Sequence, residues 1–118
     1  MKNKKILICD DEEGIRESYR LILEDDYSLI FAQDGIKAVE EFKKQAFDLV
    51  ILDIKIPKKD GLEVLKEIKA IKPGSNVLVI TGYQSASIAE ETIKLGATNY
   101  LPKPFEKNQL RKAIQTII

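Results

Sequence analysis

The fold of this chain is decided by the stretch from Phe47 to Gly61, which reads FDLVILDIKIPKKDG. Its four consecutive apolar residues, Leu49–Leu52, are typical of a parallel strand that is buried on both faces of a sheet. One carboxylate, Asp53, follows the carboxyl end of this run. In an open α/β sheet, ligands bind at the edge formed by the carboxyl ends of the strands. Asp53 by itself is equally consistent with a helix-capping or loop aspartate, so its role depends on the rest of the chain.

The same alternation of a short apolar run and a helical pattern extends over the whole chain. Apolar residues recur at helical spacing after each predicted strand, for example Ile15, Tyr19 and Ile22 after the first. Asp34 is expected to cap the second helix, and Gly96 is expected to end the fourth. The five predicted strands comprise residues 6–9, 27–32, 49–52, 77–80 and 99–101.

Strict alternation of strands and helices predicts an α/β fold, because each pair of parallel strands needs a right-handed helical crossover. The expected architecture is a doubly wound five-stranded parallel sheet of the flavodoxin-like (βα)5 type, with helices on both faces. The chain has 118 residues and shows no linker, internal repeat or low-complexity segment. We therefore expect a single domain over residues 1–118.

Composition and charge exclude several classes of function. The 19 basic and 19 acidic residues give a formal net charge of zero, so no field of the whole domain favours nucleic acid or a membrane surface. The chain has no histidine, which excludes Ser-His-Asp catalysis, a phosphohistidine carrier and a histidine-ligated zinc site. Its one cysteine, Cys9, lies in an apolar run and predicts a buried thiol in a reducing compartment, so we expect a cytoplasmic protein. The apolar residues after the basic amino terminus are too few for a signal sequence or a membrane span.

Polar side chains follow the carboxyl ends of four predicted strands. They are Asp10, Asp11, Asp53, Thr81 and Lys103. Each has an ordinary explanation by itself, since an aspartate can cap a helix, a threonine can bond a backbone group and a lysine can be solvated. Their shared position at one edge of the sheet predicts a functional site instead.

These residues make the chain resemble the receiver domains of bacterial two-component response regulators over its whole length. The motifs that carry the resemblance are Asp10-Asp11, the strand-end Asp53, the following Pro57 and Gly61, Thr81-Gly82, Tyr100 and Lys103-Pro104-Phe105. The resemblance implies that Asp53 accepts a phosphoryl group from a sensor histidine kinase or a histidine phosphotransfer protein. It also implies a signalling domain that catalyses only its own phosphorylation and dephosphorylation and is not otherwise an enzyme.

The resemblance implies a magnesium site formed by Asp10, Asp11, Asp53 and the backbone carbonyl of Lys55, with Mn²⁺ able to substitute. The residue types agree with this implication. Two carboxylates about 5 Å apart repel by roughly 3 kcal/mol at an effective dielectric near 20, so three together bind a proton or recruit a cation. Mg²⁺ prefers hard oxygen ligands, whereas zinc or copper would require nitrogen or sulfur.

The resemblance further implies how the site binds the phosphoryl group and signals. Lys103 and Thr81 are expected to contact the phosphoryl oxygens, and the Lys103–Pro104 peptide bond is expected to be cis. In the implied switch, Thr81 moves toward the phosphoryl group and Tyr100 turns inward to fill the vacated space. Tyr100 has an ordinary alternative as a half-buried strand aromatic, and this alternative stays open.

The resemblance also identifies residues that tune the signal and pass it on. Lys55 and Tyr83 occupy positions that influence phosphoryl lifetime, and the bulky Tyr83 is expected to shield the acyl phosphate from water. A downstream protein or output domain is expected to bind the surface formed by the fourth helix, the fifth strand and the fifth helix. Candidate exposed contacts on this surface, which fit an ordinary solvated face equally well, are Glu90, Glu91, Lys94, Lys107 and Arg111.

Two other classes of protein compete with this interpretation. A small phosphohydrolase with a strand-end aspartate nucleophile usually carries a second carboxylate two residues later, where this chain has Lys55. A flavodoxin-like ligand binder would need a glycine- or hydroxyl-rich phosphate loop after the first strand, where residues 10–13 are all acidic and would repel phosphate. Within the receiver family, residues 81–97 are similar to receivers joined to enhancer-binding ATPase domains, whereas the end at Ile118 favours a single-domain regulator, and both versions stay open.

Overall fold

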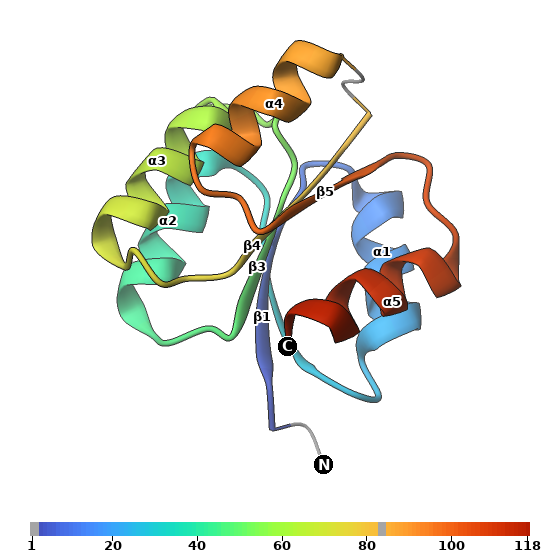
Figure 1. Ribbon diagram of the computed structural model, residues 1–118. Helices are drawn as coiled ribbons and strands as arrows, with labels where there is room; N and C mark the ends of the chain where they lie inside the picture. The colour runs from blue at the N-terminus through green and yellow to red at the C-terminus, as the bar shows by residue number, and fades with distance from the viewer. Residues whose placement is uncertain (1–2, 83–84) are drawn as a thin grey trace.

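The computed structural model of the protein describes residues 3–82 and 85–118, and helices and strands alternate along them (Figure 1). The elements are β1 (Lys5–Cys9), α1 (Glu13–Leu23), β2 (Ser28–Ala32), α2 (Gly35–Lys44), β3 (Leu49–Leu52), α3 (Gly61–Ile71), β4 (Val77–Thr81), α4 (Ala86–Lys94), β5 (Asn99–Pro102) and α5 (Lys107–Ile117). The predicted alternation is confirmed, and the predicted strand boundaries agree with these bounds to within one residue.

All neighbouring strands are parallel, in the order β2-β1-β3-β4-β5. This is the flavodoxin-like order, so the predicted fold class is confirmed. The register sets Cys9 beside Leu52 and Thr81 beside Pro102. The residues that follow these strand ends therefore meet at one edge of the sheet.

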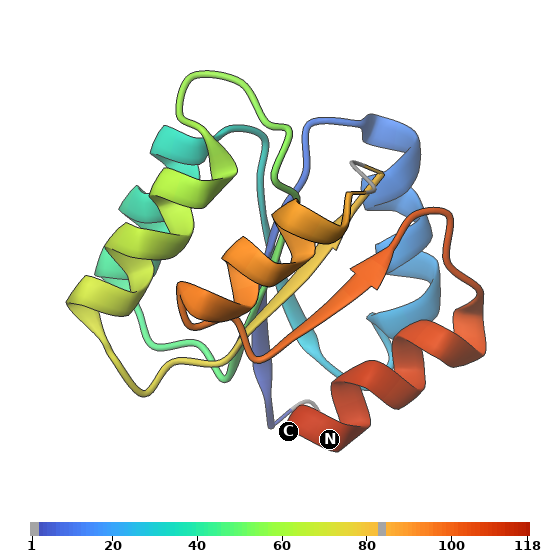
Figure 2. The same cartoon turned by 45° about the horizontal axis from the view of Figure 1, so that its top comes forward.

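The sheet is covered on both faces, by α1 and α5 on one side and by α2, α3 and α4 on the other (Figures 1 and 2). In β3, Leu49 and Ile51 pack toward α1 and α5, while Val50 and Leu52 pack toward the opposite helices. All four are at most 1% exposed, as expected for a central parallel strand. Burying such side chains stabilises the fold by about 1.5–3 kcal/mol each, and this rigid strand carries Asp53.

Two of the helix ends are formed by residues that the sequence predicts. The Asp34 carboxylate accepts a hydrogen bond from the Lys37 N–H at 2.8 Å and caps α2. Gly96 follows the end of α4 with a φ of +102°, a left-handed conformation that glycine adopts without cost. Both expectations are confirmed.

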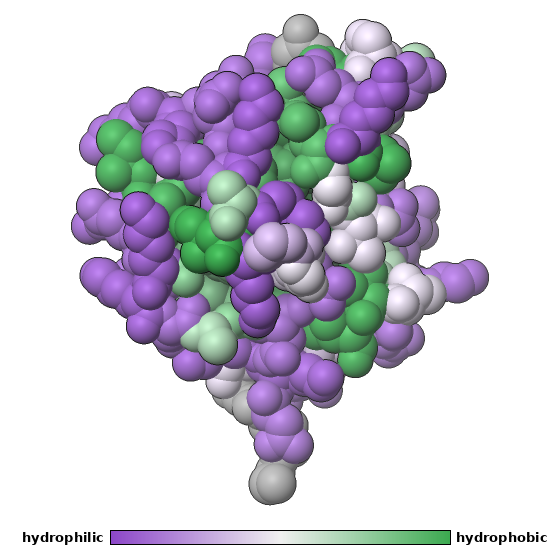
Figure 3. All heavy atoms as spheres, turned by 60° about the vertical axis from the view of Figure 1, so that its left-hand side comes forward, coloured by the Kyte–Doolittle hydropathy of each residue, from purple (hydrophilic) through white to green (hydrophobic). Residues whose placement is uncertain are grey.

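The surface that carries α2 and α3 is mainly hydrophilic, with separate apolar patches (Figure 3). The large apolar side chains that remain exposed among the described residues lie on four different helices, and they are Leu21, Ile36, Ile71 and Ile93. In the described part of the chain, none of the helices has the length and apolar character needed to cross a bilayer.

We expect the native protein to resist alkylation of Cys9 at pH 8. Cys9 is 1% exposed, and its Sγ lies 3.7 Å from the Asp34 carbonyl oxygen. Burial, with a smaller contribution from nearby carboxylates such as Asp10, raises the pKa of Cys9 to about 12. Because the thiolate is the reactive form, mass spectrometry after iodoacetamide treatment should show no native adduct and one adduct in urea. Rapid modification of the native protein would contradict this buried position.

Candidate functional site

The predicted site residues meet at the carboxyl edge of the sheet. Asp10 follows β1, Asp53 follows β3, Thr81 ends β4 and Lys103 follows β5. Backbone hydrogen bonds extend the strand pairing to these positions: the Asp53 N–H donates to the Cys9 carbonyl at 3.1 Å, and the Lys103 N–H donates to the Thr81 carbonyl at 3.0 Å. The sheet itself therefore positions the site.

Lys103 joins the acidic residues from β1 and β3. Its Nζ lies 2.7 Å from Asp10 Oδ2 and 2.7 Å from Asp53 Oδ2. The side chains of Lys103, Asp10 and Asp53 are 10%, 1% and 5% exposed, so these are largely buried, charge-assisted hydrogen bonds. Lys103 is thus not an ordinary solvated lysine.

Burial and charge act against each other on the pKa values of this group. Burial raises the pKa of Asp10, and its hydrogen bond from Lys103 opposes that shift without reversing it. Burial alone would lower the pKa of Lys103, but hydrogen bonds and charge from Asp10 and Asp53 outweigh burial and hold it above the ordinary lysine range. Lys103 is therefore a permanent ammonium at physiological pH.

Backbone groups orient the two buried carboxylates. Asp53 Oδ1 accepts a hydrogen bond from the Lys55 N–H at 3.1 Å, and Asp10 Oδ1 accepts one from the Glu12 N–H at 3.0 Å. Arg16 Nη1 donates to the Asp10 carbonyl oxygen at 2.9 Å. Each carboxylate thus has one oxygen facing Lys103 and the other bonded to the chain that follows it.

The site contains a cluster of carboxylates whose chemistry fits a hard cation. Oxygens of Asp10, Asp11, Glu12 and Asp53 lie within 4.8 Å of one another. The cluster offers oxygen ligands only, and a divalent ion would offset the repulsion among carboxylates that the one ammonium of Lys103 leaves partly uncompensated. The donor set therefore fits Mg²⁺, with Asp10 and Asp53 buried and Asp11 and Glu12 exposed.

Glu12 is a site residue that the sequence analysis does not identify. Its Oε1 lies 3.4 Å from Lys103 Nζ, and its side chain is 63% exposed. In the sequence, the signal that points to Glu12 is its position directly after the Asp10-Asp11 pair. Glu12 also holds the N-cap position of α1 without a side-chain capping bond, so Asp11 is not the cap of that helix.

A cavity of about 170 Å³ opens beside these groups. Thr81 is buried and forms part of the cavity wall, and the Lys55 side chain is exposed. The cavity gives an anionic group access to Asp53 and Lys103 together. Its lining residues are Glu12, Asp53, Lys55, Thr81, Gly82 and Lys103.

The remaining predicted residues are placed as follows. Tyr100 is partly exposed on β5 and packs against the core on the α2, α3 and α4 side of the sheet. The Lys103–Pro104 peptide bond is cis. Tyr83 lies outside the described residues, so its role in phosphoryl lifetime stays a prediction, as does that of Lys55.

The expected exposure of one candidate output contact is wrong. Arg111 is not a freely exposed residue of α5, because its side chain is half-buried against α1. Its Nη2 donates to the Ile22 carbonyl oxygen at 3.5 Å, near the carboxyl end of that helix, where a cation is favoured. The other four candidates, Glu90, Glu91, Lys94 and Lys107, are exposed.

Comparison with known proteins decides the family. The model of the response regulator receiver domain matches residues 6–115. The chain belongs to this family. It is a receiver domain of two-component response regulators, which are signalling domains.

Three relatives illustrate the range of proteins to which this receiver is similar. It is 37% identical to sporulation initiation phosphotransferase F of Bacillus subtilis, over 98% of this chain and 94% of the relative. It is 36% identical to the transcriptional regulatory protein ZraR of Escherichia coli, over 96% of this chain but 26% of that protein. The crystal structure of a response regulator receiver domain protein from Clostridium thermocellum superposes with a TM-score of 0.90 at 35% identity, covering 98% of this chain and 94% of that one.

Proposed function

We propose that Asp53 accepts a phosphoryl group from a sensor histidine kinase or a histidine phosphotransfer protein in a Mg²⁺-dependent reaction. The observation that carries this proposal is the Lys103 ammonium, which lies 2.7 Å from the carboxylate of a buried strand-end aspartate. An anionic nucleophile that attacks an anionic donor needs such a fixed positive charge. Membership of the receiver family supports the same assignment.

The reaction follows from the chemistry of these groups. A carboxylate oxygen of Asp53 attacks phosphorus while the bond between phosphorus and the donor nitrogen breaks, and the electron pair of that bond leaves with the donor imidazole. Lys103, which faces Asp53 before the reaction, transfers its hydrogen bond to a phosphoryl oxygen. The Thr81 hydroxyl binds another phosphoryl oxygen across the cavity that both residues line.

Asp10, Asp11, Asp53 and the backbone carbonyl of Lys55 would hold the magnesium ion. When bound, Mg²⁺ lowers the repulsion between the carboxylate and the incoming phosphoryl group and stabilises the charge of the transition state. Glu12 lies close enough to this cluster to add negative charge beside it. The product is an acyl phosphate, which hydrolyses readily and suits a transient signal.

Phosphorylation is proposed to switch the receiver through Thr81 and Tyr100. Moving an equilibrium from about 1:99 to 99:1 requires about 5.5 kcal/mol of differential interaction. Two or three hydrogen bonds to a charged phosphoryl group, at about 1.5–3 kcal/mol each, are of that size. Thr81 donates one of these hydrogen bonds. Tyr100 lies on the neighbouring strand β5, and its inward rotation changes the surface of the domain.

The signal is proposed to leave through the face formed by α4, β5 and α5 and to reach a downstream protein or an output domain. This face carries an exposed apolar residue, Ile93, which is 49% exposed between charged neighbours such as Glu90 and Lys94. Both arrangements occur among the similar proteins. Sporulation initiation phosphotransferase F has nearly the length of this chain, whereas ZraR is about four times as long. We place the signalling reaction in the cytoplasm and expect no direct contact of this domain with DNA or a membrane.

Incubation with Mg²⁺ and acetyl phosphate, followed by intact mass spectrometry, tests the proposed function. We expect a single phosphoryl adduct on the wild-type chain, because Asp53 is the aspartate that lines the cavity together with Lys103 and Thr81. The adduct should disappear when EDTA removes the metal and in the Asp53→Asn variant. An adduct that forms equally well without a divalent metal would contradict the proposal.

We expect Glu12→Gln to accelerate phosphorylation by acetyl phosphate. The Glu12 carboxylate borders the cavity through which the anionic donor must approach. One charge about 5 Å away is worth about 0.8 kcal/mol in water, so the rate should rise about fourfold at low salt. Stopped-flow measurements in high salt should show a smaller difference, because exposed charges are screened. A slower variant would instead indicate that Glu12 helps to bind the metal.

A further inference from the structure

The turn between β2 and α2 is attached to the end of β1, beside the acidic cluster. The Asp10 N–H donates to the carbonyl oxygen of Ala32, the last residue of β2, at 3.1 Å. The Cys9 thiol lies 3.7 Å from the carbonyl oxygen of Asp34. Asp34 is only 8% exposed, and its carboxylate caps α2. The turn therefore has a fixed position relative to Asp10.

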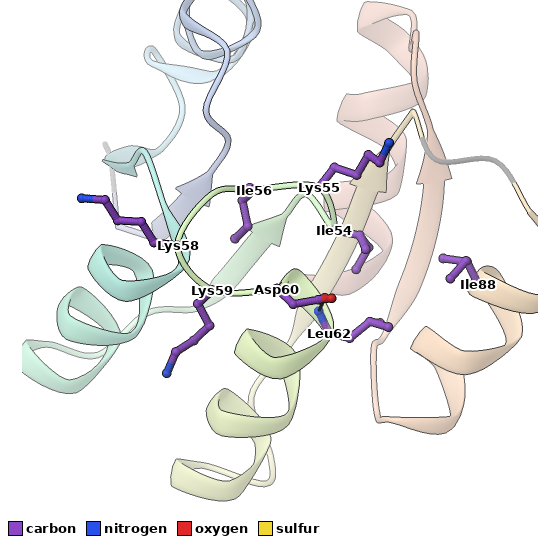
Figure 4. Close-up of a pocket in the computed structure, with 8 residues that line it drawn as sticks. All are labelled: Ile54, Lys55, Ile56, Lys58, Lys59, Asp60, Leu62 and Ile88. Carbon is purple, nitrogen blue, oxygen red and sulfur yellow. Dashed lines mark hydrogen bonds between the residues drawn. The ribbon is translucent and has the colours of Figure 1, made fainter.

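The same turn is tied to the loop that follows Asp53. The Gly35 N–H donates to the Pro57 carbonyl oxygen at 3.2 Å, and Lys58 Nζ lies 3.6 Å from Asp34 Oδ2. In Figure 4, Lys58 projects from the loop on the side of β2 and α2, whereas Lys55 points away from it. The middle of the loop is thus attached to a neighbouring element on the side opposite the Lys55 side chain.

Close packing at Gly35 leaves no room for a side chain between the turn and the loop. A Cβ added at this glycine would lie 2.6 Å from both the Cβ and the carbonyl oxygen of Lys59, and 2.9 Å from Val64 Cγ2. Real Cβ atoms do not approach a carbonyl oxygen so closely. Glycine is required here because the Gly35 main chain lies directly against Lys59 and Val64.

The other side of the loop is open. A cavity of about 460 Å³ separates it from the start of α4, as the stick view of the lining residues shows (Figure 4). Lys58 has a φ of +69°, a left-handed conformation that is costly for a residue with a side chain. A loop with an open side and a strained residue depends on its remaining attachments. The β2–α2 turn supplies the Gly35 hydrogen bond and, more weakly, the ion pair of Asp34 with the exposed Lys58.

We propose that Asp34 and Gly35 are positioning residues for the magnesium site. They hold the loop of residues 54–60 at a fixed distance from β1 and thereby place the Lys55 carbonyl relative to Asp10 and Asp11. Neither residue belongs to the carboxylate cluster that would hold the ion, so both would act through the loop. This inference rests on the proposed function, in which Lys55 contributes a ligand. Loss of an outer-shell partner typically weakens metal binding about 10- to 100-fold, which makes the effect measurable.

Isothermal titration of the full chain with Mg²⁺ alone tests the inference. We expect Gly35→Ala to weaken binding about tenfold or more, because its Cβ displaces the loop, and Asp34→Ala to weaken it roughly threefold or more. An ionic strength of about 0.5 M limits the long-range effect of the charge lost in Asp34→Ala. With acetyl phosphate as donor, both variants should need more Mg²⁺ for half-maximal phosphorylation but keep nearly the wild-type rate at saturating Mg²⁺.

The chain offers matched controls for both substitutions. Gly74→Ala adds the same methyl group where nothing lies within 4 Å. Asp48→Ala removes an aspartate that accepts a backbone hydrogen bond from the Lys5 N–H at 2.8 Å, at the opposite end of β3. Both controls should bind Mg²⁺ with wild-type affinity.

Wild-type Mg²⁺ affinity in Asp34→Ala would overturn the positioning role, even if Gly35→Ala does not fold. Equal weakening in the Asp48→Ala control would overturn it as well, because the effect would then reflect stability or charge in general. Failure of the wild-type chain to bind Mg²⁺ or to become phosphorylated would instead overturn the proposed function, and this inference with it.

Discussion

Lys103→Met is expected to lower the free energy of unfolding by about 3–5 kcal/mol in the absence of divalent metal, since it leaves buried charges without their partner. The substitution keeps most of the apolar volume of the side chain but removes the ammonium that lies 2.7 Å from both Asp10 and Asp53. Urea denaturation in EDTA measures this loss. Added Mg²⁺ should restore part of the stability, because the ion binds the folded carboxylate cluster and not the unfolded chain.

Lys37→Met is the matched control for this substitution. Lys37 also pairs with a carboxylate, Glu40, at 3.5 Å, but its side chain is 62% exposed. Exposed pairs of this kind contribute about 0–1 kcal/mol, so the control should change stability little. If Lys103→Met were as stable as the wild type in EDTA, the ammonium would not compensate the buried carboxylates, and our electrostatic description of the site would be wrong.

Gly61→Ala is expected to cost about 3 kcal/mol, at the upper end of the range for overpacking. A Cβ at this position would lie 2.5 Å from Ile54 Cα, 2.6 Å from the Ile54 carbonyl oxygen and 2.7 Å from that of Asp53. All three neighbours are backbone atoms, which cannot move aside as a flexible side chain can. The Gly61 N–H also donates to the Ile54 carbonyl at 3.0 Å, so displacement of α3 would break this bond.

Gly14→Ala provides a control with the opposite expected sign. Gly14 lies in α1 with nothing within 4 Å of an added Cβ, and alanine is favoured over glycine in a helix by about 1 kcal/mol. Thermal unfolding should therefore show a lower midpoint for Gly61→Ala and an equal or higher one for Gly14→Ala. A Gly61→Ala protein as stable as the wild type would show that the loop after Asp53 adapts, and that Gly61 does not fix its path.

The fold could be predicted because the signal for each element is local. Leu49–Leu52 forms an uninterrupted apolar run, and the structure buries all four residues on both faces of the central strand β3. Asp34 and Gly96 mark helix ends through their own backbone preferences. Parallel pairing then brings Asp10, Asp53 and Lys103 together without further information, since residues at strand ends share one edge of the sheet.

What the sequence did not reveal depends on contacts between distant segments. Glu12 reaches Lys103 across 91 positions of the chain, and its position directly after Asp10-Asp11 does not by itself indicate this contact. Arg111 is a candidate exposed contact of the output surface that the resemblance implies, but the packing of α5 against α1 half-buries it. The attachment of Gly35 to Pro57 likewise requires knowing that these two loops lie side by side.

The most direct test of the central claim is to locate the phosphoryl group chemically. Borohydride reduces an aspartyl phosphate to homoserine, so peptide mapping after phosphorylation with acetyl phosphate and Mg²⁺ identifies the acceptor. We expect homoserine at position 53, with Asp10 and Asp11 unchanged and no conversion in the Asp53→Asn variant. Conversion at another aspartate of the wild-type chain, or a stable phosphoryl group that resists borohydride, would contradict the assignment of Asp53 as the phosphoacceptor.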